Sequence, residues 1–572
     1  MSKVLGGPGK SVLRAGFSIA FVREGTNVML SVTGGNAGGA IDATRSTAQG
    51  TLPVGTLLRN RGDLTAPAIP TSPVYPLTAT ANDSVNAFSP NLVSGYVPSW
   101  TVGYQRELAK GTAFEVRYVG NRGIKLWRQY NINEINTIEN GFAQEFLLAQ
   151  ANLIANRAAG RGNTFRYAGA GTGTFPLPNM LAYFSAVAPA NAGACGGGGQ
   201  PSCATLYNSS QFTNSTLLTA LSPIVPNVIN FATTVNGNAT RRANAVAAGL
   251  PINFFQVNPT IATNFPNGGA FVVDNGGRSW YDGLVIELRR QLTNGLLIQG
   301  NYTFSKSLTD LYTVSSTVNS NYSSLRNTAL SKTNSAFDVT HAFKVNWIYE
   351  LPFGRNKQFL SDAPGWVNQT LGLWEFHGAV RLQSGTPFNY GNVQLVGMDR
   401  KQLQRSIEVR KKPNGIVTYL PDDIIANTIA AFNPDPTSTT GFSTFGVPTG
   451  RFIAPASYGG CLQRFTGECG FSNLVLYGPR FLKLDMSVVK RFQFTERTNF
   501  EFRAEFLNAI NNSPFRVGGW AADNVTFTPT TNPGGLSRTD FGQLPNGSAF
   551  QDTSTTNDPG GRLIQIVLRL NF

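Results

Sequence analysis

The last eleven residues of the chain alternate between apolar and polar side chains, and this pattern restricts how they can fold. One set of alternate positions holds Ile564, Ile566, Leu568, Leu570 and Phe572. Because successive side chains of a strand point to opposite faces, the segment predicts a strand with one apolar and one polar face. About nine to eleven residues are enough for a tilted strand to cross a membrane. A soluble edge strand is the alternative that this segment alone leaves open.

Repetition of the pattern along the chain decides between these two interpretations. We expect strands at about 11–21, 100–108, 112–120, 281–291, 296–304, 343–349, 374–382, 482–488, 500–506 and 562–572. A set of strands that each carry one apolar and one polar face is typical of an all-β, antiparallel transmembrane β-barrel of the outer-membrane type.

The connections between these strands support the barrel, because short and long ones alternate. Short turns such as Asn294-Gly295 are followed by long inserts, as expected when turns face the periplasm and loops face outward. We predict an N-terminal barrel strand and a long loop over 1–97, followed by a barrel over 98–572. Its large extracellular inserts are expected at about 121–279, 385–480 and 509–561. The connection over 351–373 is the least certain of the short ones, and the order of connections places Phe572 on the periplasmic side.

One stretch of the first insert has helical spacing. Phe142, Phe146 and Leu153 recur on one side of a segment over 141–159, and Gly160 follows as a stop signal. We therefore expect a small loop helix there. The remainder of the insert, rich in Asn and Thr up to about residue 267, is interpreted as loop.

The composition fits this fold class. Only 13% of the residues are charged and 11% are aromatic, whereas roughly 25% of the residues in ordinary soluble domains are charged. There is no apolar run of about 18 residues, so transmembrane helices are not expected. The net charge of +15 comes from scattered Lys and Arg, which argues against a nucleic-acid partner. Outer-membrane lipid and lipopolysaccharide are the expected surroundings, and the cell outer membrane is the expected location.

Charged residues occupy the polar positions of several strands. On a lipid-facing surface each would cost up to several kcal/mol near the membrane centre, so we expect these side chains to face the barrel lumen. A structural role in cross-strand pairing is the favoured interpretation for each residue, and a polar surface for a plug or a solute is the alternative. The predicted lumen-facing residues are Glu287, Arg289, Glu375, Arg381, Lys483, Asp485, Glu501, Arg503 and Glu505.

The four cysteines form two local pairs in the sequence. Cys195 and Cys203, and likewise Cys461 and Cys469, are separated by short segments without the spacing of a zinc site. We expect a disulfide in each pair, as is common outside the cytoplasm, with free thiols as the alternative. The chain has only two histidines, and no catalytic constellation or phosphate loop stands out, so no metal, no cofactor and no enzymatic activity are expected.

Several segments together resemble the barrel of Oar-like TonB-dependent transporters. They are Ser279-Trp-Tyr-Asp-Gly-Leu-Val-Ile-Glu-Leu-Arg-Arg290, Asn301-Tyr-Thr-Phe-Ser-Lys-Ser307, Ala336-Phe-Asp-Val-Thr-His-Ala-Phe343, Leu351-Pro-Phe-Gly354, Leu382-Gln-Ser-Gly-Thr-Pro387, Arg503-Ala-Glu-Phe-Leu-Asn-Ala509 and the terminal Leu570-Asn-Phe572. The resemblance runs from about residue 100 to the end. Only the combination of these segments is specific.

This resemblance implies a 22-stranded outer-membrane barrel that is normally preceded by a signal peptide, a TonB box and a plug. None of these is recognised before residue 100, so the chain resembles the C-terminal portion of such a receptor, and TonB is an expected partner only if a plug lies upstream. The resemblance also implies that Ile566, Leu568, Leu570 and Phe572 form a signal for the barrel-assembly machinery.

The function expected from the sequence is that of a TonB-dependent receptor barrel. Its loops would bind an unidentified extracellular substrate, which is then imported through the lumen. A passive porin-like channel and a surface adhesion or structural protein are the alternatives.

Overall fold

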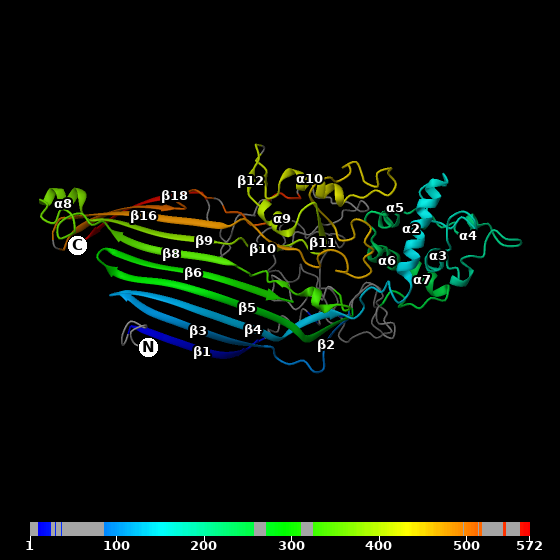
Figure 1. Cartoon of the computed structure of the whole chain (residues 1–572), viewed down its shortest axis with the longest axis horizontal. Helices are drawn as coiled ribbons and strands as arrows, with labels where there is room; N and C mark the ends of the chain where they lie inside the picture. The colour runs from blue at the N-terminus through cyan, green and yellow to red at the C-terminus, as the bar shows by residue number, and fades with distance from the viewer. Residues whose placement is uncertain are drawn as a thin grey trace, which may run out of the picture.

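The predicted strands pair with one another in a single twelve-stranded sheet (Figure 1). The computed structural model describes residues 10–23, 29, 32, 36, 85–256, 270–310, 324–413, 415–495, 497–512, 514–517, 541–544 and 561–572. Along the sheet the order of the main strands is β1-β3-β4-β5-β6-β8-β9-β16-β17-β18, and every neighbouring pair is antiparallel.

The ten main strands confirm all ten predicted ones. They are β1 (Ser11–Phe21), β3 (Tyr96–Ala109), β4 (Thr112–Asn131), β5 (Ala270–Thr293), β6 (Leu296–Thr309), β8 (His341–Glu350), β9 (Trp374–Gln383), β16 (Phe481–Gln493), β17 (Asn499–Leu507) and β18 (Leu563–Asn571). Two short strands join the sheet beside this path: β2 (Val85–Phe88) pairs with β5 in parallel, and β7 (Thr333–Asn334) pairs with β6.

The sheet is open in the described part of the chain. β1 and β18 lie at its two ends and do not pair with each other. These residues therefore form an open antiparallel sheet with the alternating pattern of a barrel wall. They show no closed barrel, and the 22-stranded barrel of which the chain was expected to be a part stays a prediction.

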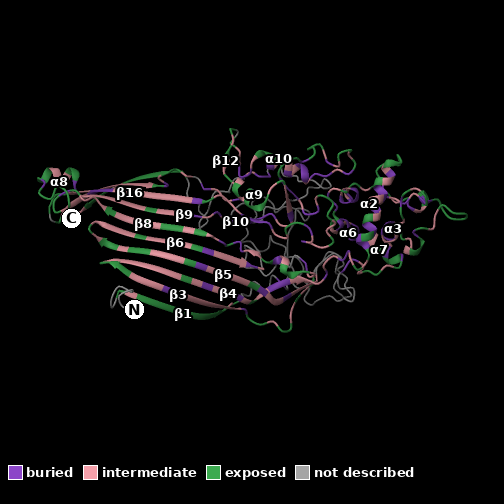
Figure 2. Ribbon diagram, viewed as in Figure 1, coloured by how far each residue is buried: buried purple, intermediate pink, exposed green. Residues whose placement is uncertain are grey.

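The register keeps apolar side chains together on one face of the sheet. Val488 of β16 pairs with Ala504 of β17 and with Phe376 of β9. At the two ends of the sheet this face is bare, since Phe17 of β1 is 68% exposed and Ile566 of β18 is 63% exposed. Figure 2 shows that buried residues are concentrated outside the sheet. A sheet with one exposed apolar face needs an apolar medium against it.

The short and long connections lie at opposite ends of the sheet (Figure 1). At one end are tight turns, including Asn294-Gly295, in which both residues have positive φ (52° and 76°). The connection over 351–373 lies at this same end and contains the short helix α8 (Gly365–Leu371). All the long described connections lie at the other end, as the alternation of lengths predicted.

The connection between β4 and β5 folds into a compact unit over residues 132–256, here called the helical lobe. Its helices are α2 (Phe142–Ala158), α3 (Pro178–Ser185), α4 (Cys203–Leu206), α5 (Ser215–Ala220), α6 (Val228–Asn236) and α7 (Ala239–Ala247), with 3-10 turns η3 (Pro189–Asn191) and η4 (Ser210–Thr213). α2 confirms the predicted helix, and Gly160 follows it with φ 70°. The interpretation of the rest of the insert as loop was wrong.

Aromatic rings fill the core of the helical lobe. Phe142 and Phe146 of α2 both pack against Phe231 of α6, and Phe165 packs edge-to-face on Phe212. All five are fully buried. Edge-to-face aromatic pairs contribute about 0.5–1.5 kcal/mol beyond the area that they bury, so the lobe has a core of its own.

The connection between β9 and β16 forms a second lobe over residues 384–480. It contains the ladders β10 (Pro387–Asn389) with β15 (Val475–Tyr477), β11 (Val393–Val396) with β14 (Phe452–Pro455), and β12 (Arg410–Lys411) with β13 (Val417–Thr418), together with helices α9 (Arg400–Ser406) and α10 (Asp422–Ala431). Its core packs Phe388 edge-to-face against Tyr390 and Tyr419. The hydroxyl of Tyr390 donates to that of Tyr419 at 3.1 Å, and burial raises the pKa of Tyr390.

The bounds of the inserts differ in one case from those predicted. β4 continues to Asn131 and β5 begins at Ala270, so the first insert spans 132–269 instead of 121–279. The second insert lies between Gln383 and Phe481, where 385–480 was expected. The third lies between Leu507 and Leu563, and most of it falls outside the described residues, as does most of the predicted loop that precedes residue 97. None of the helices among the described residues is long and apolar enough to cross a membrane.

Candidate functional site

A first network of charges lies where β4 and β5 pair. The Nε of Arg289 lies 3.1 Å from Glu287, and its Nη2 lies 3.7 Å from Glu115 on the neighbouring strand. Arg117 lies 3.6 Å from the same Glu115. Because Glu115 faces Glu287 directly across the two strands, the arginines separate carboxylates that would otherwise repel each other.

A second network connects β9, β16 and β17. Arg491 of β16 contacts Glu375 of β9 through Nη1, and its Nε lies 3.0 Å from Glu501 of β17. Arg503 continues the chain of contacts, at 2.7 Å from Glu501 and 3.5 Å from Glu505. The side chains of Glu375 and Glu501 are only 13% and 8% exposed, so these pairs are shielded from water far more than ordinary surface ion pairs.

The remaining charges of this face have partners on their own or the next strand. Lys483 lies 3.5 Å from Asp485, and the Nε of Arg381 donates to the amide oxygen of Gln383 at 3.0 Å. The Nε2 of His377 lies 3.0 Å from the carboxylate of Glu375, beside the second network.

The cross-strand register places all nine charged residues predicted for the lumen on one face of the sheet, opposite the exposed apolar face. The continuous rows of partners run, for example, from Glu287 through Asn301 and Lys344 to Arg381 and Lys483. The nine are Glu287, Arg289, Glu375, Arg381, Lys483, Asp485, Glu501, Arg503 and Glu505. We call this face the polar wall.

Three residues of these networks were not among the nine predicted charges. Glu115 and Arg117 occupy polar positions of the predicted strand over 112–120, whereas Arg491 lay beyond the predicted end of its strand. The signal for Arg491 was present, since it continues the alternation of Lys483 and Asp485 beyond residue 488, where the predicted strand ended. β16 in fact continues to Gln493. Arg491 joins three strands, so it is the central member of the second network.

Two segments that carried the family resemblance meet where the polar wall joins the second lobe. Lys306 of β6 donates to the Asp338 carboxylate at 3.0 Å and to the Tyr477 hydroxyl at 2.8 Å. The same carboxylate accepts hydrogen bonds from the Ser307 backbone N–H at 2.6 Å and from Tyr477. Asp338 is buried. The group therefore fixes the end of β15 against the end of β6, which holds the second lobe in place above the wall.

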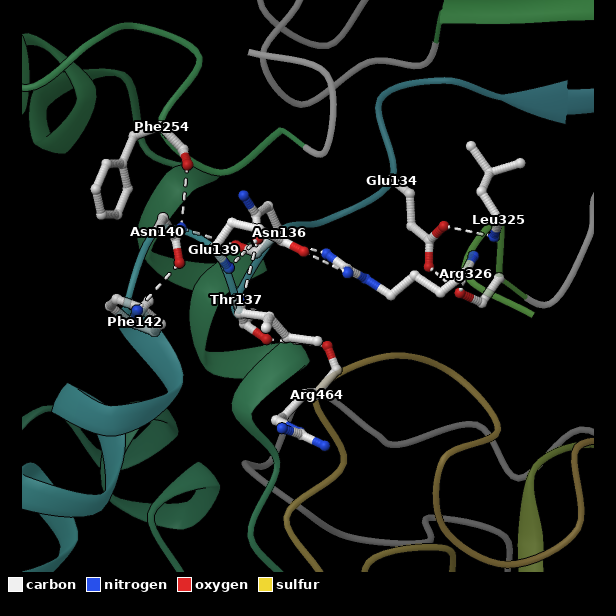
Figure 3. Close-up of polar contacts among 12 residues, drawn as sticks. Glu134, Asn136, Thr137, Glu139, Asn140, Phe142, Phe254, Leu325, Arg326 and Arg464 are labelled. Carbon is white, nitrogen blue, oxygen red and sulfur yellow. Dashed lines mark hydrogen bonds and ion pairs between the residues drawn. The ribbon is translucent and has the colours of Figure 1, made fainter.

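The helical lobe is attached through a short neck, shown in Figure 3. The Glu134 carboxylate accepts hydrogen bonds from the Ser324 hydroxyl at 2.6 Å and the Leu325 N–H at 2.7 Å. Arg326 forms a two-pronged ion pair with Glu139 and lowers the pKa of that carboxyl group. The neck thus joins the base of the helical lobe to the segment that follows β6.

The neck also connects the two lobes. The buried hydroxyl of Thr137 donates to the carbonyl of Arg464 in the second lobe at 2.9 Å, and Gly460 N–H donates to the carbonyl of Ile224 at 3.0 Å. Asn140 donates to the carbonyl of Phe254 at 3.0 Å, which brings the two ends of the helical lobe together. Loops of three long connections therefore form one continuous structure at this end of the sheet.

Each lobe contains one of the cysteine pairs. Cys195 is bonded to Cys203 in the helical lobe, and Cys461 is bonded to Cys469 in the second lobe. The second disulfide closes the loop that carries Arg464, so it lies next to the contact with Thr137. Each lobe also has a surface cavity, of about 420 Å³ in the helical lobe and about 480 Å³ in the second.

A family model, described as outer membrane beta barrel domain, matches residues 4–565. The chain belongs to this outer membrane beta barrel family. No curated protein matches the sequence.

Among solved structures, this outer membrane barrel protein is similar to the outer membrane transporter YddB from Escherichia coli, with 7% identity and a TM-score of 0.30 over 86% of this chain and 35% of that chain. It is also similar to a mutant of the ferric enterobactin receptor PfeA from Pseudomonas aeruginosa, with 9% identity and a TM-score of 0.29. That match covers 98% of this chain and 38% of the PfeA chain. It is similar as well to the siderophore receptor PiuA from Acinetobacter baumannii, with 8% identity and a TM-score of 0.26. That match covers 84% of this chain and 29% of the PiuA chain. The chain spans about a third of the length of these receptors.

The family places the chain in the outer membrane, and the apolar face of the sheet is suited to lipid. Both ends of this face carry an aromatic ring with a cation. Near the lobes, the Arg122 guanidinium lies 5.2 Å from the Trp100 ring, and Arg122 also pairs with Asp282 at 3.1 Å. Near the tight turns, the Lys490 ammonium lies 5.2 Å from the Trp374 ring and donates to the carbonyl of Gly372. Such amphipathic groups are common where a barrel surface meets the lipid head groups.

In the part of this barrel protein that the structure describes, no group of three or more His, Cys, Asp or Glu side chains could hold a metal ion. The polar groups instead form two kinds of site: a wall of paired charges along the sheet, and lobes with cavities at one end of it.

Proposed function

We propose that this chain supplies part of the barrel wall and the ligand-binding loops of a TonB-dependent outer-membrane receptor. The two lobes bind a ligand outside the cell, and the ligand then moves inward along the polar wall, which faces the lumen. The finer resemblance to Oar-like receptors is part of this proposal. TonB would act through a plug supplied by a longer protein, and the barrel-assembly machinery would recognise the exposed apolar side of β18, including Phe572.

The observation that carries the proposal is the position and construction of the long connections. They gather at one end of the sheet, and two of them fold into lobes that have hydrophobic cores and disulfides. Loops that are held rigidly above a scaffold are where binding residues are usually placed. A general pore would not require such ordered lobes, so a receptor explains them better.

The proposal can be tested by removing the helical lobe without disturbing the sheet. Ile135 bridges to Gln256 at the base of the lobe, so residues 137–254 can be replaced by a short Gly-Ser linker between adjacent points. The full-length gene and this deletion would be expressed in cells with and without TonB. A shift in gel mobility on heating would verify that both proteins form barrels, and depletion of solutes from the medium would be measured by untargeted mass spectrometry.

A receptor predicts that at least one solute is depleted only when both the lobe and TonB are present. A passive channel predicts depletion that is independent of TonB and is unchanged or increased by the deletion. An adhesion or structural protein predicts that no solute depends on the gene. Either of the last two results would overturn the proposal.

A further inference from the structure

The helical lobe has an unusual set of charges. Residues 132–256 contain no Lys, Asp or His, and their charged side chains are three glutamates and five arginines. The arginines are Arg157, Arg161, Arg166, Arg241 and Arg242. All the basic side chains of the lobe are therefore arginines. This points to recognition of a carboxylate or phosphate group, because the planar guanidinium can bind such a group with two parallel hydrogen bonds, whereas Lys acts as a point charge.

None of the three glutamates neutralises these arginines. Glu134 and Glu139 lie in the neck, where they bind Ser324, Leu325 and Arg326. Glu145 is buried, and its carboxylate accepts hydrogen bonds from the backbone N–H groups of residues 179 and 180 at 2.9 Å and 2.7 Å. The acids of the lobe are therefore used for its attachment and its core, and its outer surface is cationic.

Two of the arginines line the 420 Å³ cavity. The cavity lies beyond the C-terminal end of α2, and its walls include Arg161, Arg166, Asn163, Thr164, Tyr167 and Thr213. Such a volume is in the range of pockets for small molecules. The hydroxyls of Thr164 and Thr213 already donate to the carbonyls of Phe212 and Ser210. The two guanidinium groups are therefore the main donors that this wall offers to an anion.

The two guanidinium groups are held in place with donors to spare. Arg166 Nε donates to the buried hydroxyl of Thr164 at 3.1 Å, and Arg161 Nη1 donates to the side chain of Asn156 at 3.4 Å. Arg161 Nη1 also donates to the carbonyl of Thr172 at 3.5 Å. Among the described residues, neither arginine has an ion-pair partner, and the Nη groups of Arg166 make no hydrogen bond within the protein. Arg157 is not part of the lining.

The backbone that carries these arginines is fixed by a buried amide. Asn156 donates through Nδ2 to the carbonyls of Thr164 and Arg166, at 3.0 Å and 2.9 Å, and its carbonyl accepts from Arg161 N–H at 2.8 Å. Next to Thr164, Phe165 is anchored in the aromatic core. The cavity is thus preformed, which reduces the entropy lost when a ligand binds.

We propose that this cavity is a binding site for a small ligand that carries a carboxylate or phosphate group, held between Arg161 and Arg166. The inference rests on the proposed receptor function for its biological meaning, since it names the chemical class of the captured ligand. The binding itself does not depend on transport.

The test measures binding by the full chain, folded in detergent, with isothermal titration calorimetry. The probes are citrate for carboxylates, inorganic pyrophosphate for phosphates, and glucose as a neutral control. The buffer contains about 0.15 M salt, so that charges more than about 8 Å away are largely screened. The variants are Arg161→Gln/Arg166→Gln, Arg161→Lys/Arg166→Lys as a pair that retains the charge, and Arg242→Gln as a control outside the cavity.

We expect saturable binding of at least one of the two anions and no binding of glucose. Whether citrate or pyrophosphate binds shows whether the site prefers a carboxylate or a phosphate group. The Gln pair should weaken binding about tenfold or more, the Lys pair should weaken it less, and Arg242→Gln should change it by less than about twofold. The proposal is overturned if neither anion binds the unchanged protein, or if Arg242→Gln weakens binding as much as the Gln pair. If the Lys pair binds with full affinity, recognition through two parallel hydrogen bonds is refuted. This measurement can be made even if the Gln pair fails to fold. A failure of TonB-dependent uptake would leave these binding results unchanged, so the two proposals can fail separately.

Discussion

The central role of Arg491 in the polar wall leads to a quantitative prediction. Replacing it with Met removes the cation between Glu375 and Glu501 while keeping most of the side-chain volume. Breaking a fully buried ion pair costs about 3–5 kcal/mol, and an exposed pair contributes about 0–1 kcal/mol. The side chain of Arg491 is 38% exposed and those of its partners 13% and 8%. After allowance for solvent screening, we expect a loss of about 2 kcal/mol in the free energy of unfolding.

The assay is urea-induced unfolding of the folded protein in phospholipid–detergent mixtures, followed by tryptophan fluorescence. Arg117→Met is the matched control, because Arg117 has a single carboxylate at 3.6 Å and is 42% exposed; it should cost no more than about 0.5–1 kcal/mol. A double-mutant cycle with Glu375→Gln should give a coupling energy of about 1 kcal/mol. The reasoning is refuted if Arg491→Met and Glu375→Gln are additive, or if Arg117→Met is equally destabilising.

Three further predictions concern the helical lobe, the apolar face and the second lobe. Burial raises the pKa of Glu145 to about 7, above its unfolded value, so its stabilising contribution is complete at low pH and is lost as pH rises from about 4.5 through 7. Glu145→Gln should remove this pH dependence of stability, which is worth on the order of 3 kcal/mol at most. Hydrogen exchange in α3 measures the stability of both proteins. A stability difference between them that stays constant from pH 5 to pH 8 would contradict the prediction. Gly378→Val should destabilise the sheet by about 1–3 kcal/mol, because a Cβ there collides with the ring of Trp347 on the paired strand; Ala379→Val on the other face is the control, and equal effects in urea unfolding would argue against the packing explanation. Replacing Cys461 and Cys469 by Ser should increase protease cleavage between them and loosen the contact of Arg464 with Thr137, with little effect on the heat-dependent gel mobility of the barrel; unchanged cleavage would contradict this role.

The strands could be predicted from the sequence because membrane strands are constrained on both faces. Lipid on one side and polar contacts on the other require alternation at nearly every position, so β18 is evident from the last eleven residues of the chain. In β4 the prediction stopped early because the alternation is interrupted there. In β4 the pairing with β5 shifts between Gly123 and Leu126 and again before Arg128. Such bulges change which face a side chain occupies, and for this reason the last eleven residues of β4 were interpreted as insert.

The helices of the helical lobe were missed because the residues that start them also favour loops. Asn214, Asn227 and Asn238 are the N-caps of α5, α6 and α7, and each side chain accepts a hydrogen bond from a backbone N–H of the following turn. Asn favours helix starts and turns through the same local hydrogen bonds, so an Asn-rich stretch is ambiguous until the spacing is considered. These caps recur every 11–13 residues, each followed by buried apolar side chains. That spacing was the available signal for short helices.

The polar wall and its networks show a different limit. The sequence indicated which face each charge occupies, but not its partners, because the partners come from strands that are far apart in the chain: Arg491 contacts Glu375, 116 residues away. The cavity of the helical lobe was also out of reach, since it depends on how Asn156 folds the chain back onto α2.

The distribution of charge supports a division of labour between wall and lobe. The nine predicted wall residues are five acids and four bases, and Glu115, Arg117 and Arg491 bring these twelve to balance. Lys344, Arg569 and Glu350 on the same face add two bases and one acid, so little of the net charge of +15 comes from these wall residues. Mutual pairing leaves the wall polar but nearly neutral, and in the proposed receptor such a wall would let a charged solute pass without being held. In the helical lobe the arginines lack ion-pair partners among the described residues, so their field is available to a ligand. The proposed anion site therefore assigns selection by charge to the lobe. Substitutions in the wall should alter stability before they alter affinity, and substitutions of Arg161 and Arg166 should do the reverse.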